Sequence, residues 1–411
     1  MAVTERLIVW LHDRPVATID RRRGGDARLT YTTEAIERFQ INTPLLSCSL
    51  PITSRPHDAT TFVDGLLPEG EHRRLLADRA RIAAHDTYGL IARYGRDIAG
   101  AVQFRPDGDN AAGSSRWAVE QLDSDRIDGL VAELPANPLA IDDESELSLA
   151  GLQNKMLLVR MPDGSWGRPL HGRPSTHILK RDSERHRGIV AAESDALSVA
   201  RHIGLTPVQA WVEAHGGYDC LIVERFDRVV DGDGNVVARV HQEDACQALG
   251  IAPTRKYEVH HGGGGPAFEQ IAQVLDRYAA VPTAELDRLA ALAAFNAIVG
   301  NADAHGKNVG FLLDGDGTIR LAPVYDVVPT VLWPALRRDM AMSLGGAVSP
   351  GAMNLAALAR EAKRWRHSES SATAAAARCA QAMIAAVEDG VVDTDGPLAH
   401  RIRQAARAFV P

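Results

Sequence analysis

The feature that most constrains this chain is a polar segment held between two apolar elements. Residues Leu289–Val299 predict a buried helix and Val309–Leu313 predict a buried strand, whereas Asn301–Asn308 between them are mostly polar. Polar groups enclosed by apolar elements are stable only when they find hydrogen-bonding partners or a ligand. The segment therefore predicts either a capped, hydrogen-bonded turn or a functional loop.

Spacing within this segment favours a loop that transfers phosphate. Asp303 and Asn308 stand five residues apart, the spacing by which a kinase catalytic loop presents its aspartate to the substrate hydroxyl and its asparagine to a metal ion. A turn at residues 314–317 reverses the chain, so the return strand can bring Asp326 back beside them. Asp326 then resembles the metal-binding aspartate of a kinase.

The rare lysines could supply the positive charge that phosphate transfer needs. Of the 45 basic residues only five are lysines, and the compact ammonium of lysine suits a tight phosphate pocket better than the wide guanidinium of arginine. Lys180, at the end of a predicted strand, would reach the phosphates of ATP and pair with Glu193 in the next helix. Asn308 and Asp326 would hold Mg²⁺. The alternative reading of Lys180 is a solvated strand end.

Hydrophobic patterning divides the chain into three regions of a mixed α/β fold. Residues 1–140 predict a small β meander with helices, and 141–240 predict the strand, strand, helix, strand, strand order of a nucleotide-binding lobe. Residues 241–411 predict a mostly helical lobe. A chain of 411 residues exceeds what one core usually organises, which agrees with several packed units.

Several local elements can be predicted within these regions. Strands are expected at Leu7–Trp10, Pro15–Ile19 and Arg28–Tyr31, and Asp86 is expected to cap a helix. The strands at 155–160 and 176–180 are expected to pair, joined by a glycine-rich loop.

Composition excludes several other classes. The net charge of −8 argues against nucleic acid as the main ligand of the surface. The four cysteines lie far apart, which suggests neither a zinc ribbon nor a disulfide framework and favours a reducing cytoplasm. The sequence contains no apolar stretch of 18 residues, so no membrane span is predicted. The GK[ST], HExxH and GxSxG signatures of P-loop ATPases, zinc proteases and α/β-hydrolases do not occur.

A set of segments in one order then points to a family. In the C-terminal part these segments are Ser148–Lys155, Thr176–Lys180, Val223–Arg228, Gln242–Asp244, Asp303–Asn308 and Pro323–Asp326. In the N-terminal part they are Val9–Leu11, Leu46–Pro51, Gly65–Pro68 and Gly95–Ala101. Together they resemble the HipA-like serine/threonine kinases, the toxin halves of bacterial toxin–antitoxin pairs. The resemblance implies an N-terminal β/α domain followed by a two-lobed protein-kinase-like fold.

The resemblance also implies roles for single residues. The phosphate-contacting loop would be Ala150, Gly151, Leu152, Gln153, Asn154 and Lys155. The hinge that holds adenine would be Glu224, Arg225 and Phe226. The remaining ATP and metal contacts would be His305, Gly306, Lys307, Asn308, Tyr325 and Asp326. Ser148 aligns with a serine that some members autophosphorylate to switch themselves off. Asn154 departs from the acidic residue common at its place, a change that a backbone-mediated phosphate cradle would tolerate.

Finally, the resemblance implies a target and a partner. The target would be a cytoplasmic protein, such as the glutamyl aminoacyl-tRNA synthetase, and translation would be inhibited. A helix-turn-helix antitoxin of the HipB type would neutralise the kinase and carry it to operator DNA. Two alternatives stay open, namely a small-molecule kinase with the same metal and lysine arrangement, and a non-catalytic corepressor that binds ATP or an antitoxin without turnover.

Overall fold

The computed structural model describes residues 6–109, 117–137, 154–232, 234–259 and 263–410. They form two compact units, between which the chain passes repeatedly. The first unit comprises residues 1–181, 213–243 and 313–317, and the second comprises 182–212, 244–312 and 318–411.

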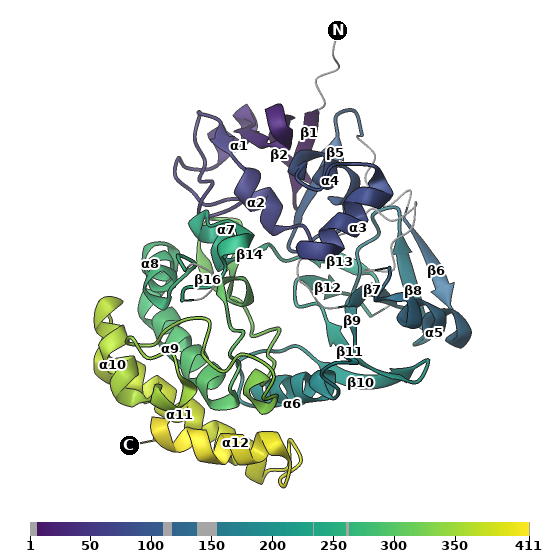
Figure 1. The fold of residues 1–411 in the computed structure, drawn as a ribbon. Coiled ribbons are helices and arrows are strands. Elements are labelled where there is room, and N and C mark those ends of the chain that lie inside the picture. The colour runs from purple at the N-terminus through teal and green to yellow at the C-terminus, as the bar shows by residue number, and fades with distance from the viewer. Residues whose placement is uncertain (1–5, 110–116, 138–153, 233, 260–262, 411) are drawn as a thin grey trace. The chain divides into compact units, whose positions relative to one another are not determined.

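The first unit begins with an antiparallel sheet covered by helices. Its strand order is β4-β3-β2-β1-β5, with β1 (Arg6–Leu11), β2 (Arg14–Arg21), β3 (Ala27–Tyr31), β4 (His57–Asp58) and β5 (Val102–Pro106). The three predicted N-terminal strands are thus confirmed. Alternate residues of β1 and β3 are buried, as expected for a sheet with one face in a core. The helices beside it are α1 (Thr33–Arg38), α2 (Thr60–Gly65), α3 (Gly70–Ala80) and α4 (Thr87–Tyr94) (Figure 1).

The start of α4 shows why the local predictions succeed. The Asp86 side chain accepts a hydrogen bond from the backbone N–H of Gly89 at 2.9 Å, so Asp86 is the predicted N-cap. Such a bond satisfies one of the backbone donors that every helix start leaves without an internal partner. The cap positions Tyr88, Leu90 and Ile91 in the core of the first sheet.

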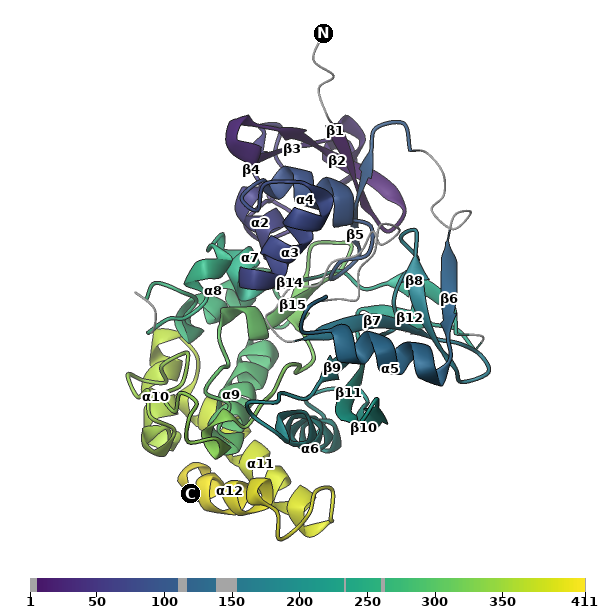
Figure 2. The same ribbon diagram turned by 45° about the vertical axis from the view of Figure 1, so that its right-hand side comes forward.

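A second sheet of the first unit carries the predicted lysine strands. Its order is β10-β11-β9-β7-β8-β6, with β6 (Ala118–Leu122), β7 (Lys155–Arg160), β8 (Trp166–Leu170), β9 (His177–Arg181), β10 (Ala210–His215) and β11 (Tyr218–Glu224). Strands β7 and β9 pair antiparallel, as predicted. Helix α5 (Ser124–Glu133) lies beside this sheet (Figure 2).

Two strand features of this unit differ from the sequence predictions. The segment expected as a loop between β7 and β9 contains β8, which pairs with both β6 and β7. Trp166 is buried in it, and a Cβ on Gly167 would lie 2.2 Å from Val119, so glycine here permits strand packing rather than a turn. A short hairpin of β12 (Arg228–Val230) and β13 (Val236–Arg239) follows β11 and was not predicted.

The second unit is mostly helical around one central helix. Its helices are α6 (Ile189–His202), α7 (Ala245–Leu249), α8 (Phe268–Tyr278), α9 (Pro282–Val299), α10 (Leu355–Arg364), α11 (Glu369–Glu388) and α12 (Pro397–Ala405). The C-terminal half of α9 is buried almost throughout, and α8, α11 and α12 pack against it (Figure 2). A helix that is apolar on all sides must be enclosed in this way.

A small sheet combines one strand from before the polar segment with two strands from after it. It contains β14 (Gln242–Asp244), β15 (Gly310–Leu313) and β16 (Ile319–Leu321), with β15 in the middle. Strands β15 and β16 form the predicted hairpin after the polar segment. None of the helices in the described part of the chain is long and apolar enough to cross a bilayer.

Candidate functional site

The polar segment begins where the buried helix α9 ends. Gly300 adopts a left-handed conformation (φ +78°), and its N–H bonds to the carbonyl of Asn296 at 3.0 Å. The next turn is anchored by side chains, since Asn301 Nδ2 donates to Asn296 Oδ1 at 3.0 Å and Ala302 N donates to Thr330 Oγ1 at 2.9 Å. The N-terminal part of the segment is therefore a hydrogen-bonded turn that fixes where Asp303 emerges.

Asn308 closes this turn onto Asp303. Its Nδ2 donates to the backbone carbonyl of Asp303 at 3.0 Å, and His305 N donates to the same oxygen at 2.7 Å. The amide nitrogen of Asn308 is therefore committed to the loop. Its Oδ1 makes no hydrogen bond within the residues that the structure describes, and this oxygen is the atom that a cation would use.

The Asp303 carboxylate accepts a hydrogen bond from a residue that sequence reasoning missed. Tyr257 Oη donates to Asp303 Oδ1 at 2.7 Å. Although Asp303 reaches the surface, the loss of water around its carboxylate raises its pKa above the ordinary aspartate value. The Tyr257 bond opposes that shift and the nearby negative charge of Asp326 adds to it. A carboxylate with a raised pKa is a stronger base than an ordinary one.

Asp326 comes from the far side of the β15–β16 hairpin. Tyr325 Oη donates to the backbone carbonyl of Lys307 at 2.8 Å, which ties the residue before Asp326 to the polar segment. Burial raises the pKa of Tyr325 well above its usual value, so it stays a donor. Asp326 has a left-handed backbone (φ +55°), unusual for a residue with a side chain. The second unit thus brings Asp303, Asn308 and Asp326 together.

Lys307 forms an ion pair within the second unit, and its expected nucleotide contact stays a prediction. Its ammonium is buried and forms an ion pair with Asp244 at 2.8 Å. Asp244 caps α7, because its side chain accepts from Gln247 N at 2.9 Å. The Lys307 side chain therefore fastens the polar segment to α7.

His305 and Gly306 complete the segment. Burial lowers the pKa of His305 to about 3, so the ring is neutral at physiological pH. Its Nδ1 is buried without a hydrogen-bond partner among the described residues. A Cβ on Gly306 would lie 2.3 Å from the Pro266 ring, so only glycine fits there. The orphaned Nδ1 is a polar atom that a ligand could satisfy.

In the first unit, the two predicted phosphate-binding lysines lie on adjacent strands. Lys155 on β7 is directly opposite Lys180 on β9, and both are only 7% exposed. Asn154, just before β7, accepts a hydrogen bond from Arg181 N through its carbonyl at 3.0 Å. Side chains directly opposite in an antiparallel pair point to the same face, so the two lysines leave the sheet on one face.

The predicted hinge follows the end of β11. Glu224 is its last residue, and Arg225 N continues the pairing by donating to the Thr176 carbonyl at 2.9 Å. The Arg225 side chain is buried away from solvent, donating to Asp227 at 2.8 and 2.9 Å and to Ser175 Oγ at 2.8 Å. The Arg225 side chain is thus engaged within the protein, and the adenine contact expected of residues 224–226 stays a prediction.

Arg225 belongs to a buried ion cluster that includes the N-terminal region. Asp97 accepts hydrogen bonds from Ser175 N at 2.9 Å and from Arg228 Nη2 at 2.8 Å, and it has no solvent exposure. Surrounding arginines hold the pKa of both Asp97 and Asp227 below the ordinary value despite burial. The cluster contains Asp97, Arg225, Asp227, Arg228 and Arg239. Sequence reasoning missed it, although Asp97 and Arg228 both lie in the segments that suggested a family.

Some expectations concern residues that the structure does not describe or relate. Ser148, Ala150, Gly151, Leu152 and Gln153 lie outside the described residues. Glu193 is buried on α6 in the second unit, whereas Lys180 belongs to the first, so their pairing stays a prediction.

The donor set around Asn308 and Asp326 fits the predicted Mg²⁺. An amide oxygen and a carboxylate are hard oxygen ligands, and Mg²⁺ is usually held by one or two carboxylates together with substrate phosphates and water. No group of three or more His, Cys, Asp or Glu side chains converges within the described ranges. Asn308 and Asp326 would therefore hold the ion together with oxygens of the nucleotide.

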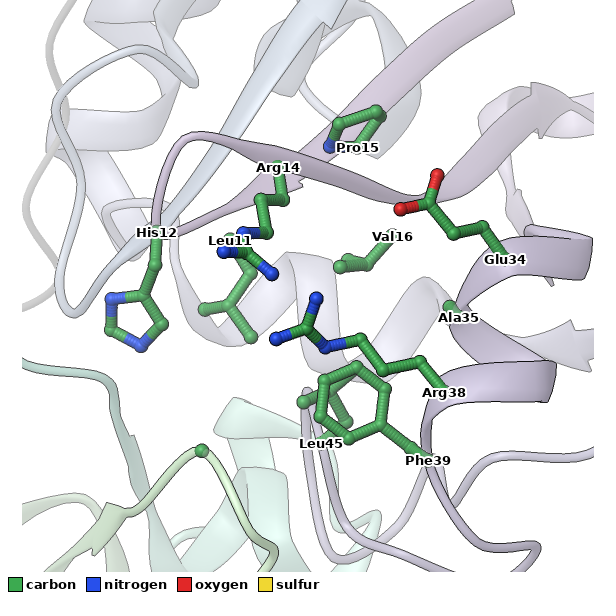
Figure 3. A pocket seen from close by; sticks show the side chains of 11 residues that line it. Leu11, His12, Arg14, Pro15, Val16, Glu34, Ala35, Arg38, Phe39 and Leu45 are labelled. Atoms are coloured by element: carbon green, nitrogen blue, oxygen red, sulfur yellow. The ribbon is translucent and has the colours of Figure 1, made fainter.

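A pocket of about 270 Å³ lies elsewhere, in the N-terminal region of the first unit. Figure 3 shows Leu11, Val16 and Leu45 at its apolar base and the side chains of Arg14 and Arg38 beside it. None of the predicted site residues lines it. The pocket is therefore separate from the site described above.

Comparison with known proteins adds independent findings. Residues 7–105 match the family described as HipA N-terminal domain, and residues 147–391 match HipA-like C-terminal domain. A protein of Sinorhizobium fredii named "Putative kinase Y4mE" is 37% identical over 355 residues, which cover 85% of this chain and 83% of that relative. The serine/threonine-protein kinase toxin HipA of Shewanella oneidensis is 29% identical over 326 residues, covering 75% and 72%.

A solved structure shares the fold. The complex of HipA, HipB and operator DNA from Shewanella oneidensis contains a chain that matches with a TM-score of 0.80 at 23% identity, covering 98% of this chain and 96% of that one. This likeness confirms the predicted mixed α/β fold.

Proposed function

Because the chain belongs to the HipA-like family, we propose that it is an ATP- and Mg²⁺-dependent serine/threonine protein kinase and the toxin of a toxin–antitoxin pair. The observation that carries this proposal is the convergence of Asp303, Asn308 and Asp326 within one compact unit. Phosphoryl transfer needs an acceptor-orienting carboxylate and oxygen ligands for a metal, and these three side chains offer both.

Asp303 would act on the acceptor. Its carboxylate would accept the proton of a serine or threonine hydroxyl while that oxygen bonds to the γ-phosphorus and the bond to the leaving ADP oxygen breaks. The raised pKa of Asp303 makes it a better proton acceptor than an ordinary aspartate. Asn308 and Asp326 would hold Mg²⁺, which when bound neutralises negative charge on the transferring group.

The first unit would hold the nucleotide. Lys155 and Lys180, which lie opposite each other on β7 and β9, would supply the point charges that attract phosphates. The backbone at Glu224–Phe226 would contact adenine, and residues 150–155 would cradle the phosphates. If residues 224–226 contact adenine through the backbone, the side chain of Arg225 is available for the buried ion cluster.

The partner and target are proposed from the relatives. The Shewanella complex contains HipB and operator DNA, so we expect this chain to bind a helix-turn-helix antitoxin of the HipB type and to reach DNA only through it. We expect a cytoplasmic protein target such as glutamyl aminoacyl-tRNA synthetase, inhibited translation, and autophosphorylation at Ser148 as an off-switch.

The test separates protein from metabolite acceptors. The full chain is incubated with γ-labelled ATP and Mg²⁺, once with a cytoplasmic protein fraction and once with a metabolite fraction. Label on serine or threonine of a protein is the expected result. Label only in metabolites would identify a small-molecule kinase, and bound ATP without any transfer would identify a non-catalytic corepressor. Mass spectrometry of the ATP-treated chain tests Ser148, and an absence of phosphate there would reject this off-switch.

A further inference from the structure

A tyrosine hydroxyl of the chain is hydrogen-bonded to one oxygen of the proposed catalytic carboxylate, Asp303. Tyr257 Oη donates to Asp303 Oδ1 at 2.7 Å. Asp303 Oδ2 makes no hydrogen bond with any residue that the structure describes. The two oxygens of one carboxylate are therefore unequal: one is held by the protein, and the other is open to a second donor.

Tyr257 is itself held firmly on both sides. The carbonyl of Lys256 accepts from Gly306 N at 3.0 Å, which joins this segment to the polar loop. On the other side, Glu258 accepts from Ser343 N at 2.6 Å and from Ser343 Oγ at 2.9 Å. These bonds hold the residues on both sides of Tyr257 in place and so restrict where its side chain can lie.

The Tyr257 ring has a partner in the same loop. It stands edge-to-face against the His305 ring, with centroids 5.1 Å apart and an interplanar angle of 84°. Edge-to-face contacts orient aromatic rings. The hydroxyl is thus directed at Asp303 by contacts that a phenylalanine at the same position would keep.

We propose that Tyr257 is a positioning residue for phosphoryl transfer, which fixes the Asp303 carboxylate through Oδ1 so that Oδ2 receives the acceptor hydroxyl. This role rests on the proposed function. An exposed carboxylate such as that of Asp303 can rotate about its side-chain bonds, and each misplaced rotamer removes the base from the reacting hydroxyl. One fixed hydrogen bond restricts that rotation before the acceptor arrives.

The opposite role is also chemically conceivable and gives a different result. If the acceptor had to displace the Tyr257 hydroxyl from Oδ1, removing that hydroxyl would strengthen acceptor binding. The two roles therefore differ in whether kcat or the acceptor KM changes.

The experiment measures steady-state transfer from γ-labelled ATP to casein as the probe acceptor. Tyr257→Phe is expected to lower kcat at least about tenfold, the effect of losing one hydrogen bond to a charged group. The KM values for ATP and casein should stay within about twofold. Tyr278→Phe, at the end of α8 and outside the site, is the matched control and should leave kcat unchanged.

A double variant makes the test specific. Adding Tyr257→Phe to Asp303→Asn should cause no further loss, because the hydroxyl acts only through the carboxylate. An unchanged kcat in Tyr257→Phe, a lower KM for casein, or an additive loss in the double variant would overturn the inference alone. Nucleotide binding by the wild-type chain without transfer to casein or to the protein fraction would instead overturn the proposed function.

Discussion

Lys155 and Lys180 face each other directly across the β7–β9 pair. Two like charges at opposed positions of a sheet normally destabilise it, and these two are nearly excluded from water. Under the proposed function these two side chains would contact the phosphates of ATP, and the effect of removing one charge can be measured.

Replacing one of the opposed lysines should weaken nucleotide binding. Lys180→Met keeps the length of the side chain and removes the charge, so we expect ATP affinity to fall about tenfold or more, as for the loss of one charge-assisted contact. Thermal unfolding with and without Mg·ATP measures this, since the stabilisation by ATP should shrink. An ATP-induced shift equal to that of the wild type would contradict the phosphate role of Lys180.

The predictions that the structure bears out depend on local patterns. The helix cap at Asp86 can be predicted from the few residues around it. The same holds for β1 and β3, in which buried residues alternate with less buried ones. The β15–β16 turn is likewise local, and it carries Asp326 back towards Asp303. The spacing of Asp303 and Asn308 and the hairpin after them were therefore enough to predict that Asp326 returns to the polar segment.

Contacts that depend on distant side chains could not be predicted. Asp97 and Ser175 are 78 residues apart, and Gly100 and Asp227 are 127 apart. Most aspartates and arginines lie at the surface unless they are paired, so sequence alone predicts a surface position for the members of this cluster. Tyr257 gave no signal of its own, although the rare Lys256 beside it marks the segment. The strand β8 was not predicted because glycine is common in turns, and Gly167 was therefore assigned to a loop.

The buried ion cluster should be sensitive to the loss of one carboxylate. Asp97→Asn would leave three buried arginines facing one remaining acid, so we expect a loss of about 3–5 kcal/mol in the free energy of unfolding. Urea denaturation of both proteins measures the difference. Asp20→Asn is the matched control, because its ion pair with Arg6 lies at the surface and should contribute less than about 1 kcal/mol. Equal losses in the two variants would contradict the cluster's role.

Stability should fall as pH drops below neutrality. Burial lowers the pKa of His241 to about 4 from 6.5, so the unfolded chain binds more protons between these values. The stability contributed by the neutral ring is complete above pH 6.5 and is lost as the pH falls to about 4, amounting to about 3 kcal/mol. His241→Gln should flatten the dependence of unfolding free energy on pH in this window. An unchanged slope would show that the ring titrates normally.

The central proposal is that Asp303 acts as the general base for phosphoryl transfer and does more than shape its loop. Its most direct test is to measure nucleotide affinity and phosphoryl transfer side by side in the wild-type chain and in Asp303→Asn. The variant should bind Mg·ATP within about twofold of the wild type and lose transfer by about a hundredfold or more, the contribution expected of a general base. Equal turnover in the two proteins would contradict the mechanism.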